Sequence, residues 1–137
     1  MKYLAFFSLF TLFTLSSASQ SDAEEFVLSC THQETVHIAS GKRRYGLDPQ
    51  AYTVNTGDMT ITEDVCCGLD PAIDKYTERG NSIYWTIGDN THQGMEARIT
   101  LDRITGLKKM RFWYNNNGTI ELDSVRTDLC ERKEKIF

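Results

Sequence analysis

The sequence predicts a mainly β protein, an antiparallel barrel or sandwich of seven or eight strands with at most one short helix. Apolar and polar residues alternate in many short segments, which is the period of half-buried strands. Gly, Asn and Asp residues separate these segments at close intervals, as in antiparallel barrels. An apolar leader followed by four cysteines is typical of a small exported domain held together by disulfide bonds.

Residues 1–18 have the features of a secretory signal peptide. Lys2 supplies the positive charge, an apolar run follows, and small residues precede the expected cleavage site. The run is shorter than the roughly 18 residues that a membrane span needs. We therefore expect residues 19–137 to be a single secreted or periplasmic domain that leaves the membrane once the signal is removed.

Residues 25–31 and 34–39 predict the first two strands. The loop that follows contains Lys42, Arg43, Arg44 and Tyr45, the densest positive run in the chain. Such a loop is either simply solvated or a contact site for an acidic partner.

Residues 51–54 and 59–63 predict a hairpin with a four-residue loop. The parity of the apolar residues keeps one face apolar across that loop. The expected facing pairs are Tyr52 with Ile61 and Val54 with Met59.

Residues 70–80 allow two interpretations. Asp70 and Pro71 are typical of the start of a short helix that would end near Gly80. The same segment could instead supply a strand at residues 73–77 that pairs with residues 83–87. The sequence does not separate these alternatives.

Residues 95–125 predict a three-stranded meander, whose register follows from parity because a one-residue slip reverses both faces. A four-residue loop at 103–106 places Ile99 opposite Met110. The third strand keeps its apolar residues on the same face only if the loop before it has an odd number of residues. We therefore expect a three-residue loop at 116–118 with a bulge at Gly118, rather than a two-residue turn. The other expected pairs are Ala97 with Phe112, Tyr114 with Ile120 and Phe112 with Leu122.

The opposite face of this meander carries Trp113 among charged residues that include Arg98 and Arg111. One interpretation is a solvated face with cross-strand ion pairs and one packed tryptophan. The other is a contact patch centred on Trp113, since aromatic residues and arginine are enriched in binding hot spots.

The cysteines Cys30, Cys66, Cys67 and Cys130 predict two disulfide bonds. Adjacent residues of a strand point to opposite faces, so Cys66 and Cys67 should reach separate partners. Cys30 and Cys130 would then each bond to one member of that pair, with a Cys66–Cys67 bond as the less favoured alternative. An adjacent pair does not match the spacing of zinc ligands.

No segment matches a catalytic, phosphate-binding or metal-binding motif, and the three histidines have no ligand spacing. We therefore expect no cofactor, no metal and no enzymatic activity. The net charge of −4 argues against nucleic acid and anionic membranes as partners.

Two resemblances add to this interpretation. The turn from Asp102 to Gly106, followed by a strand pair and Cys130, resembles one in small exported bacterial β-proteins of unknown function. That resemblance implies an exported β-domain without assigned catalytic residues. The segment from Ser40 to Tyr45 is similar to the Ser-Gly-x-x-Tyr loop of periplasmic inhibitors of c-type lysozyme, with one additional residue.

These observations favour an exported binding module, inhibitor-like in character, for an extracellular or periplasmic protein. Its oligomeric state stays open. One alternative is a small-molecule or lipid carrier with a barrel interior, and a less favoured one is a hydrolase that uses paired carboxylates. The candidate contact residues are Lys42, Arg43, Arg44, Tyr45 and Trp113, and the carrier would line its interior with Tyr52, Trp85, Phe112 and Tyr114.

Overall fold

The computed structural model describes residues 23–64, 71–88 and 94–133, and in these ranges it contains strands and no helix. The expected antiparallel β fold is confirmed, but with ten strands rather than seven or eight. No helix of the described residues is long and apolar enough to cross a bilayer. The strands are β1 (Glu25–His37), β2 (Arg43–Arg44), β3 (Gln50–Asn55), β4 (Thr60–Glu63), β5 (Ile73–Lys75), β6 (Thr77–Arg79), β7 (Ser82–Gly88), β8 (Met95–Asp102), β9 (Leu107–Asn116) and β10 (Thr119–Lys133).

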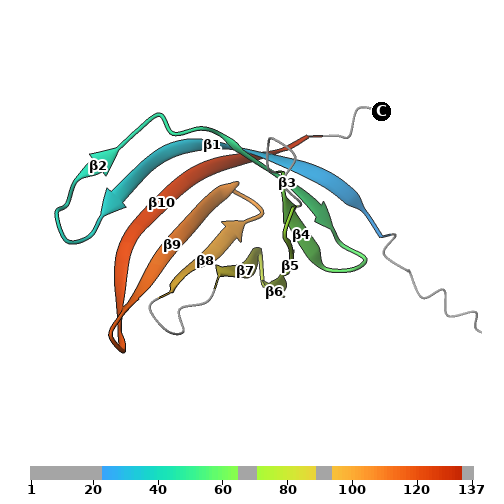
Figure 1. The fold of residues 1–137 in the computed structure, drawn as a ribbon. Helices are drawn as coiled ribbons and strands as arrows, with labels where there is room; N and C mark the ends of the chain where they lie inside the picture. The colour runs from blue at the N-terminus through green and yellow to red at the C-terminus, as the bar shows by residue number, and fades with distance from the viewer. Residues whose placement is uncertain (1–22, 65–70, 89–93, 134–137) are drawn as a thin grey trace, which may run out of the picture.

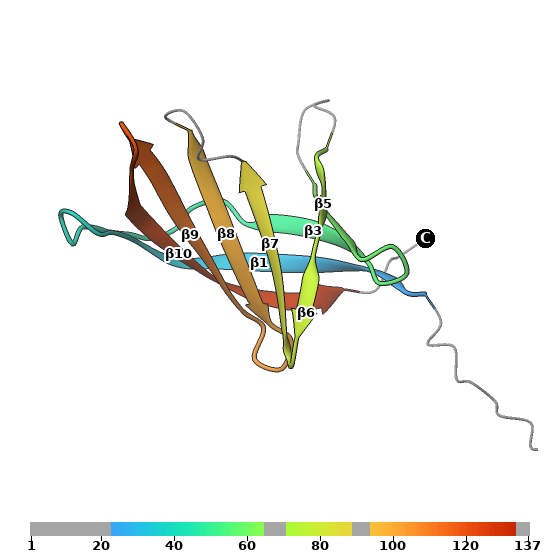
Figure 2. The same cartoon turned by 90° about the horizontal axis from the view of Figure 1, so that it is seen from below.

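All ten strands belong to one antiparallel sheet. Nine follow the order β5-β4-β3-β1-β10-β9-β8-β7-β6, and β2 pairs with β1 off this path. The sheet curls strongly, so that its two ends approach each other (Figures 1 and 2). The end strands β5 and β6 are separated in sequence by Tyr76 alone, so the chain itself connects the two edges of a nearly closed barrel.

Residues 73–75 and 77–79 form strands rather than a helix, but the expected single strand at 73–77 paired with 83–87 is wrong. β5 pairs with β4, whereas β6 turns back on β7. Arg79 lies opposite Ser82, so the turn between β6 and β7 consists of Gly80 and Asn81. Gly80 has a φ of +59°, which glycine adopts without the steric cost of a side chain.

The first strand is continuous where two strands were expected. No turn separates residues 31 and 34, and β1 pairs with β10 from Val27 to His37. A bulge between His32 and Glu34 shifts the register by one residue. As a result His32 is buried before the bulge and Thr35 is buried after it.

The β3–β4 hairpin has the expected parity and a register displaced by two residues. Val54 lies opposite Ile61, and Tyr52 lies opposite Glu63. A shift of two residues leaves each side chain on the same face, so Tyr52, Val54 and Ile61 are all buried as expected.

The β8–β9 pairing is confirmed residue for residue. Ile99 lies opposite Met110 and Ala97 opposite Phe112. The carboxylate of Asp102 accepts hydrogen bonds from the backbone N–H groups of Ile104 (2.8 Å) and Thr105 (3.0 Å), which holds the loop in shape.

The expected three-residue loop between β9 and β10 is wrong. Asn116 pairs with Thr119, so the turn is the two residues Asn117 and Gly118, both with positive φ. The parity that this turn breaks is restored by a bulge between Leu122 and Ser124. Ser124 consequently takes the place opposite Phe112 that was expected for Leu122.

One disulfide bond joins Cys30 to Cys130, which corrects the expected bonds to Cys66 and Cys67. Cys30 on β1 lies directly opposite Cys130 on β10, which brings the two side chains together across neighbouring strands. Cys66 and Cys67 lie outside the described residues. Disulfide bonds persist in oxidising compartments, so this bond is consistent with an extracellular or periplasmic location.

Candidate functional site

The structure places part of the sequence-predicted contact site on one outer face of the barrel. Arg43 lies opposite Val36, Val36 opposite Val125, Val125 opposite Arg111, and Arg111 opposite Arg98. Directly opposed residues share a face, so this row crosses five neighbouring strands. At about 4.8 Å between strands, the row is about 19 Å wide.

Trp113 extends this row on β9, two residues beyond Arg111 and on the same face. The Arg98 guanidinium carbon lies 5.2 Å from the centroid of the Trp113 ring, a cation–π contact. Arg98 is held there by an ion pair of 2.5 Å with Glu96, the residue opposite Trp113. Among the described residues, the indole N–H of Trp113 is a buried donor without a hydrogen-bond partner.

The bulge in β10 adds apolar residues to this face. Before the bulge Leu122 lies opposite Trp113, and after it Val125 lies opposite Arg111. Both side chains are half-buried. We call this surface the Trp113 patch; it comprises Val36, Arg43, Arg98, Arg111, Trp113, Leu122 and Val125.

Strand β2 places Arg43 and Arg44 of the predicted basic loop on opposite faces of the sheet. Arg43 forms an ion pair of 2.6 Å with Glu34 on β1, which raises the pKa of Arg43. Arg44 pairs with Thr35, whose side chain is buried, and so lies on the opposite face of the sheet. Tyr45, at the end of β2, is 64% exposed.

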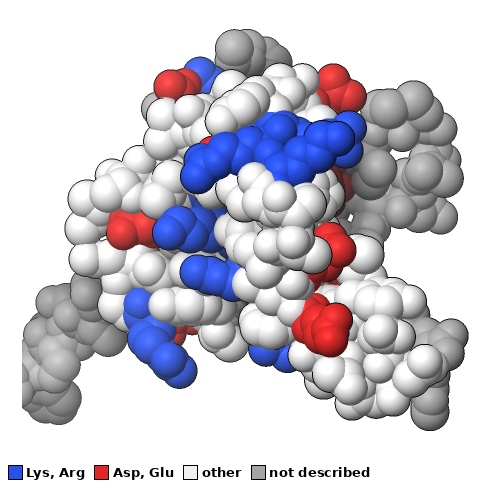
Figure 3. All heavy atoms as spheres, turned by 90° about the vertical axis from the view of Figure 1, so that its left-hand side faces the viewer, with Lys and Arg blue, Asp and Glu red and all other residues white. Residues whose placement is uncertain are grey.

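The charge of this side of the molecule is predominantly positive, although the chain as a whole has a net charge of −4. Lys and Arg side chains gather across the upper and central part of the surface in Figure 3, with isolated acidic groups around them. Glu34 and Glu96 are paired with Arg43 and Arg98. Within the described part of the chain, Arg111 has no ion pair.

A second polar cluster lies inside the barrel and was missed in the sequence. The ammonium group of Lys108 contacts a carboxylate oxygen of Asp128 (2.7 Å), the side-chain carbonyl of Gln50 (2.7 Å) and the hydroxyl of Tyr52 (2.9 Å). Both charged side chains are completely buried. Burial lowers the pKa of Lys108 despite the opposing effect of Asp128. The signal was available, because Lys108 has the same parity as the inward-facing Met110 and Phe112.

The cluster around Lys108 is best understood as structural, because its hydrogen-bonding groups are satisfied internally. Arg126 contacts the second oxygen of Asp128 at 2.8 Å, and Tyr52 donates to Gln50 at 3.0 Å. Close by, Nδ1 of His32 accepts from Leu47 N–H, so its Nε2 is left to donate to Thr35. In the described ranges no group of three His, Cys, Asp or Glu side chains could hold a metal ion.

The expected carrier cavity is not where the sequence placed it. Tyr52 and Trp85 pack edge to face in the core, with ring centroids 5.8 Å apart, and so occupy the centre of the barrel. Phe112 packs against that core from a partly buried position, and Tyr114 is 41% exposed.

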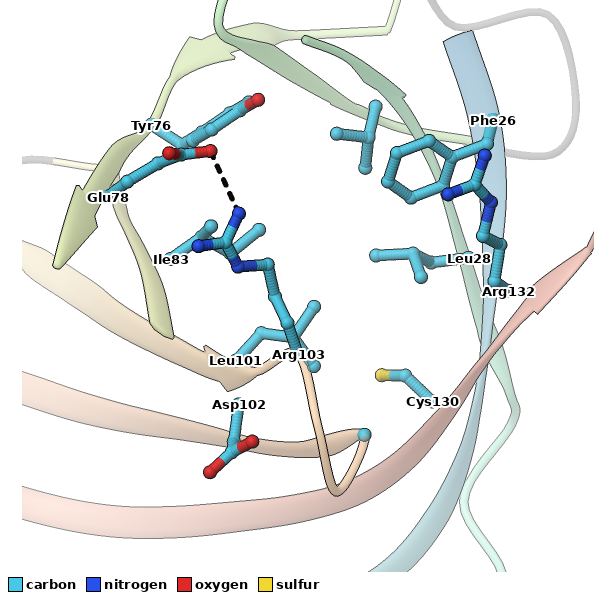
Figure 4. Close-up of a pocket in the computed structure, with 12 residues that line it drawn as sticks. Phe26, Leu28, Tyr76, Glu78, Ile83, Leu101, Asp102, Arg103, Cys130 and Arg132 are labelled. Atoms are coloured by element: carbon cyan, nitrogen blue, oxygen red, sulfur yellow. Dashed lines mark hydrogen bonds and ion pairs between the residues drawn. The ribbon is translucent and has the colours of Figure 1, made fainter. Parts of the chain in front are cut away.

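A pocket of about 180 Å³ lies at the end of the barrel that carries the β8–β9 loop. It is bounded by the N-terminal half of β1 and by strands β6 to β8 (Figure 4). Its walls are mostly apolar, and an ion pair between Arg103 and Glu78 lies at its edge. The lining residues are Phe26, Leu28, Val54, Tyr76, Glu78, Ile83, Leu101, Asp102, Arg103, Gly106, Cys130 and Arg132.

In comparisons with protein-family models, curated proteins and solved structures, nothing matches this chain. Its function is therefore inferred from the geometry of the Trp113 patch and the pocket.

Proposed function

We propose that this protein is an exported protein-binding module that recognises an acidic surface of its partner through the Trp113 patch. The observation that carries the proposal is the cation–π contact of Arg98 with Trp113 on an outward-facing strand. A half-buried tryptophan beside arginines is the composition of a protein-binding hot spot.

The scaffold supports binding because it holds these side chains in place before the partner arrives. Arg98 is fixed by Glu96 and by the Trp113 ring, and Arg43 is fixed by Glu34. Arg98 and Arg43 therefore lose less side-chain freedom on association than unpaired arginines would, which lowers the entropic cost of binding. The half-buried Leu122 and Val125 add apolar contact area between the arginines.

The charge of the patch favours an acidic partner. Of the three arginines in the patch, Arg43 and Arg98 are paired with glutamates, and Arg111 has no ion pair with a described residue. Opposite charges across an interface increase the association rate and suppress wrong partners. A secreted or periplasmic enzyme with an acidic active-site rim would fit, in keeping with the inhibitor-like character inferred from the sequence.

The test is capture from the host's own extracellular proteins, followed by affinity measurement with the purified partner. The disulfide-bonded chain from residue 19 is used as bait, together with its Trp113→Ala and Arg111→Glu variants. We expect both variants to fold and to bind the partner at least about tenfold more weakly, a difference of about 1.4 kcal/mol in binding free energy.

Arg79→Glu is the matched control, because Arg79 also lies over an aromatic ring, that of Tyr84, at 5.8 Å. These two residues belong to β6 and β7, outside the Trp113 patch. Affinity within about twofold of wild type is expected for this variant, well under 1 kcal/mol. An equal loss in the control, or unchanged affinity in both patch variants, would overturn the proposal.

A further inference from the structure

We propose that the pocket at the end of the barrel binds a compact, uncharged molecule about the size of one aromatic ring. This inference does not depend on the Trp113 patch. The pocket is lined from inside the barrel, whereas the patch lies on the outer face, and the two share no residue.

The size of the pocket sets the size of the ligand. An apolar cavity of about 150 Å³ lined by Leu, Ile and Phe stays dry and takes up benzene. The pocket here has a volume of about 180 Å³, and Phe26, Leu28, Val54, Ile83 and Leu101 contribute apolar side chains to its wall. Pockets for drug-sized ligands begin at about 300 Å³, so a long acyl chain does not fit.

The charges around the pocket argue for an uncharged ligand. Arg103 donates to Glu78 at 3.1 Å and to the carbonyl of Gly80 at 2.8 Å. Arg132 is paired with Glu24 and lies 4.1 Å from the centroid of the Phe26 ring. A ligand carboxylate would have to compete with an existing ion pair for either arginine.

The carboxylate of Asp102 is also engaged, because it accepts the two backbone hydrogen bonds of the 103–106 loop. These bonds lower the pKa of Asp102 and keep it ionised in its structural role. Asp102 follows the inward-facing Leu101 on β8, so its side chain points to the opposite face of the sheet, and Figure 4 shows its carboxylate directed away from the space between the walls. It is therefore not placed to act as a counter-ion for a cationic ligand in the pocket.

Tyr76 supplies a polar anchor within the apolar wall. Its side chain is 3% exposed, and no hydrogen bond joins its hydroxyl to another described residue. Figure 4 shows this hydroxyl directed toward the space between the two walls of the pocket. A neutral ring with one hydrogen-bonding substituent, such as a phenol, matches this arrangement of one polar group among apolar ones.

The experiment is a titration of the folded, disulfide-bonded protein with p-cresol, followed by NMR of ¹³C-labelled methyl groups. We expect saturable shifts of the Leu28, Ile83 and Leu101 methyl signals, which line the pocket. 4-Methylbenzoate has the same ring and a negative charge, and should bind at least about tenfold more weakly. Equal binding of the two compounds, or shifts confined to the outer face, would overturn the proposal.

Two variants and one control test the pocket wall and the Tyr76 hydroxyl separately. Leu101→Phe adds volume to the pocket wall and should abolish p-cresol binding, whereas Leu129→Phe, at an exposed leucine of β10, should not. Tyr76→Phe should weaken p-cresol about threefold to tenfold and leave toluene unaffected. If Leu101→Phe does not fold, the Tyr76→Phe comparison decides, because equal loss for both compounds contradicts the anchoring role.

Discussion

Asp128 is the central residue of the buried polar cluster that contains Lys108. Lys108 has three N–H donors, and each has an acceptor, in Asp128, Gln50 and Tyr52. Asp128 has a larger role, because it also neutralises Arg126. Removing one partner of a buried pair leaves an uncompensated charge, which costs far more than replacing both partners together.

This asymmetry makes a prediction for stability. We expect Asp128→Asn to lower the free energy of unfolding by about 3–5 kcal/mol, because it strands two cations in the interior. Lys108→Met should cost less, about 1–3 kcal/mol, because Arg126 still pairs with Asp128. Urea unfolding followed by tryptophan fluorescence measures both values. A larger loss for Lys108→Met than for Asp128→Asn would contradict this account.

The exposed ion pair between Lys133 and Glu131 provides the control. Its two side chains are largely solvent-accessible, and exposed pairs of this kind contribute little to stability. Lys133→Met should therefore leave the urea midpoint unchanged. This control separates the effect of burial from the effect of removing a positive charge.

At the scale of the element, the sequence predicts a strand better than it predicts an irregularity within one. Parity gave the correct pairing of Ile99 with Met110, because β8 and β9 alternate without interruption. The same argument failed for Leu122, because a two-residue turn breaks the parity and a bulge restores it six residues later. A bulge has no apolar signature of its own, so periodicity alone does not locate it.

The candidate site was predictable only in part for the same physical reason. The outward direction of Trp113, Arg98 and Arg111 follows from local alternation. Their proximity to Arg43 depends on β2 joining the edge of β1, which is a contact between distant parts of the sheet. The pocket likewise is formed by strands from both halves of the chain, and no single segment reveals it.

The β8–β9 loop allows a direct test of close packing at an element boundary. Gly106 has a φ of +73°, and a Cβ at this position would lie 2.3 Å from the carbonyl oxygen of Cys130. Gly106→Ala should therefore lower the free energy of unfolding by about 3 kcal/mol or more, because strained backbone and steric overlap combine. Thermal unfolding of the Gly106→Ala variant and of the wild-type protein measures this difference in stability.

Gly80 offers the matched comparison for Gly106. Its φ is +59°, yet a Cβ there would meet nothing within 4 Å. Gly80→Ala should cost only the conformational term, about 1–2 kcal/mol. Equal losses of unfolding free energy at the two positions would show that the contact with the Cys130 carbonyl adds nothing to the cost of a Cβ at residue 106.

At the scale of the whole molecule, the fold solves the problem of exposed sheet edges by bringing them together. Unpaired edges invite aggregation, and natural sheets keep them short or close them. Here β5 and β6 are three residues long each, and the chain passes directly from one to the other. The Trp113 patch lies away from these edges, on the outer face of β2, β1, β10, β9 and β8.

The Cys30–Cys130 bond joins parts of the chain that are 100 residues apart. In the chain-entropy model, a closed loop of about 100 residues stabilises the folded state by about 4–5 kcal/mol, which is comparable with the total stability of a small domain. We expect the double variant Cys30→Ala, Cys130→Ala to lose stability of this order in urea unfolding. The variant Cys66→Ala, Cys67→Ala, which keeps the long-range bond, should lose much less. Peptide mapping of the wild-type protein checks the premise, since a bond from Cys30 to Cys66 or Cys67 would contradict the pairing and with it the predicted ranking of the two variants.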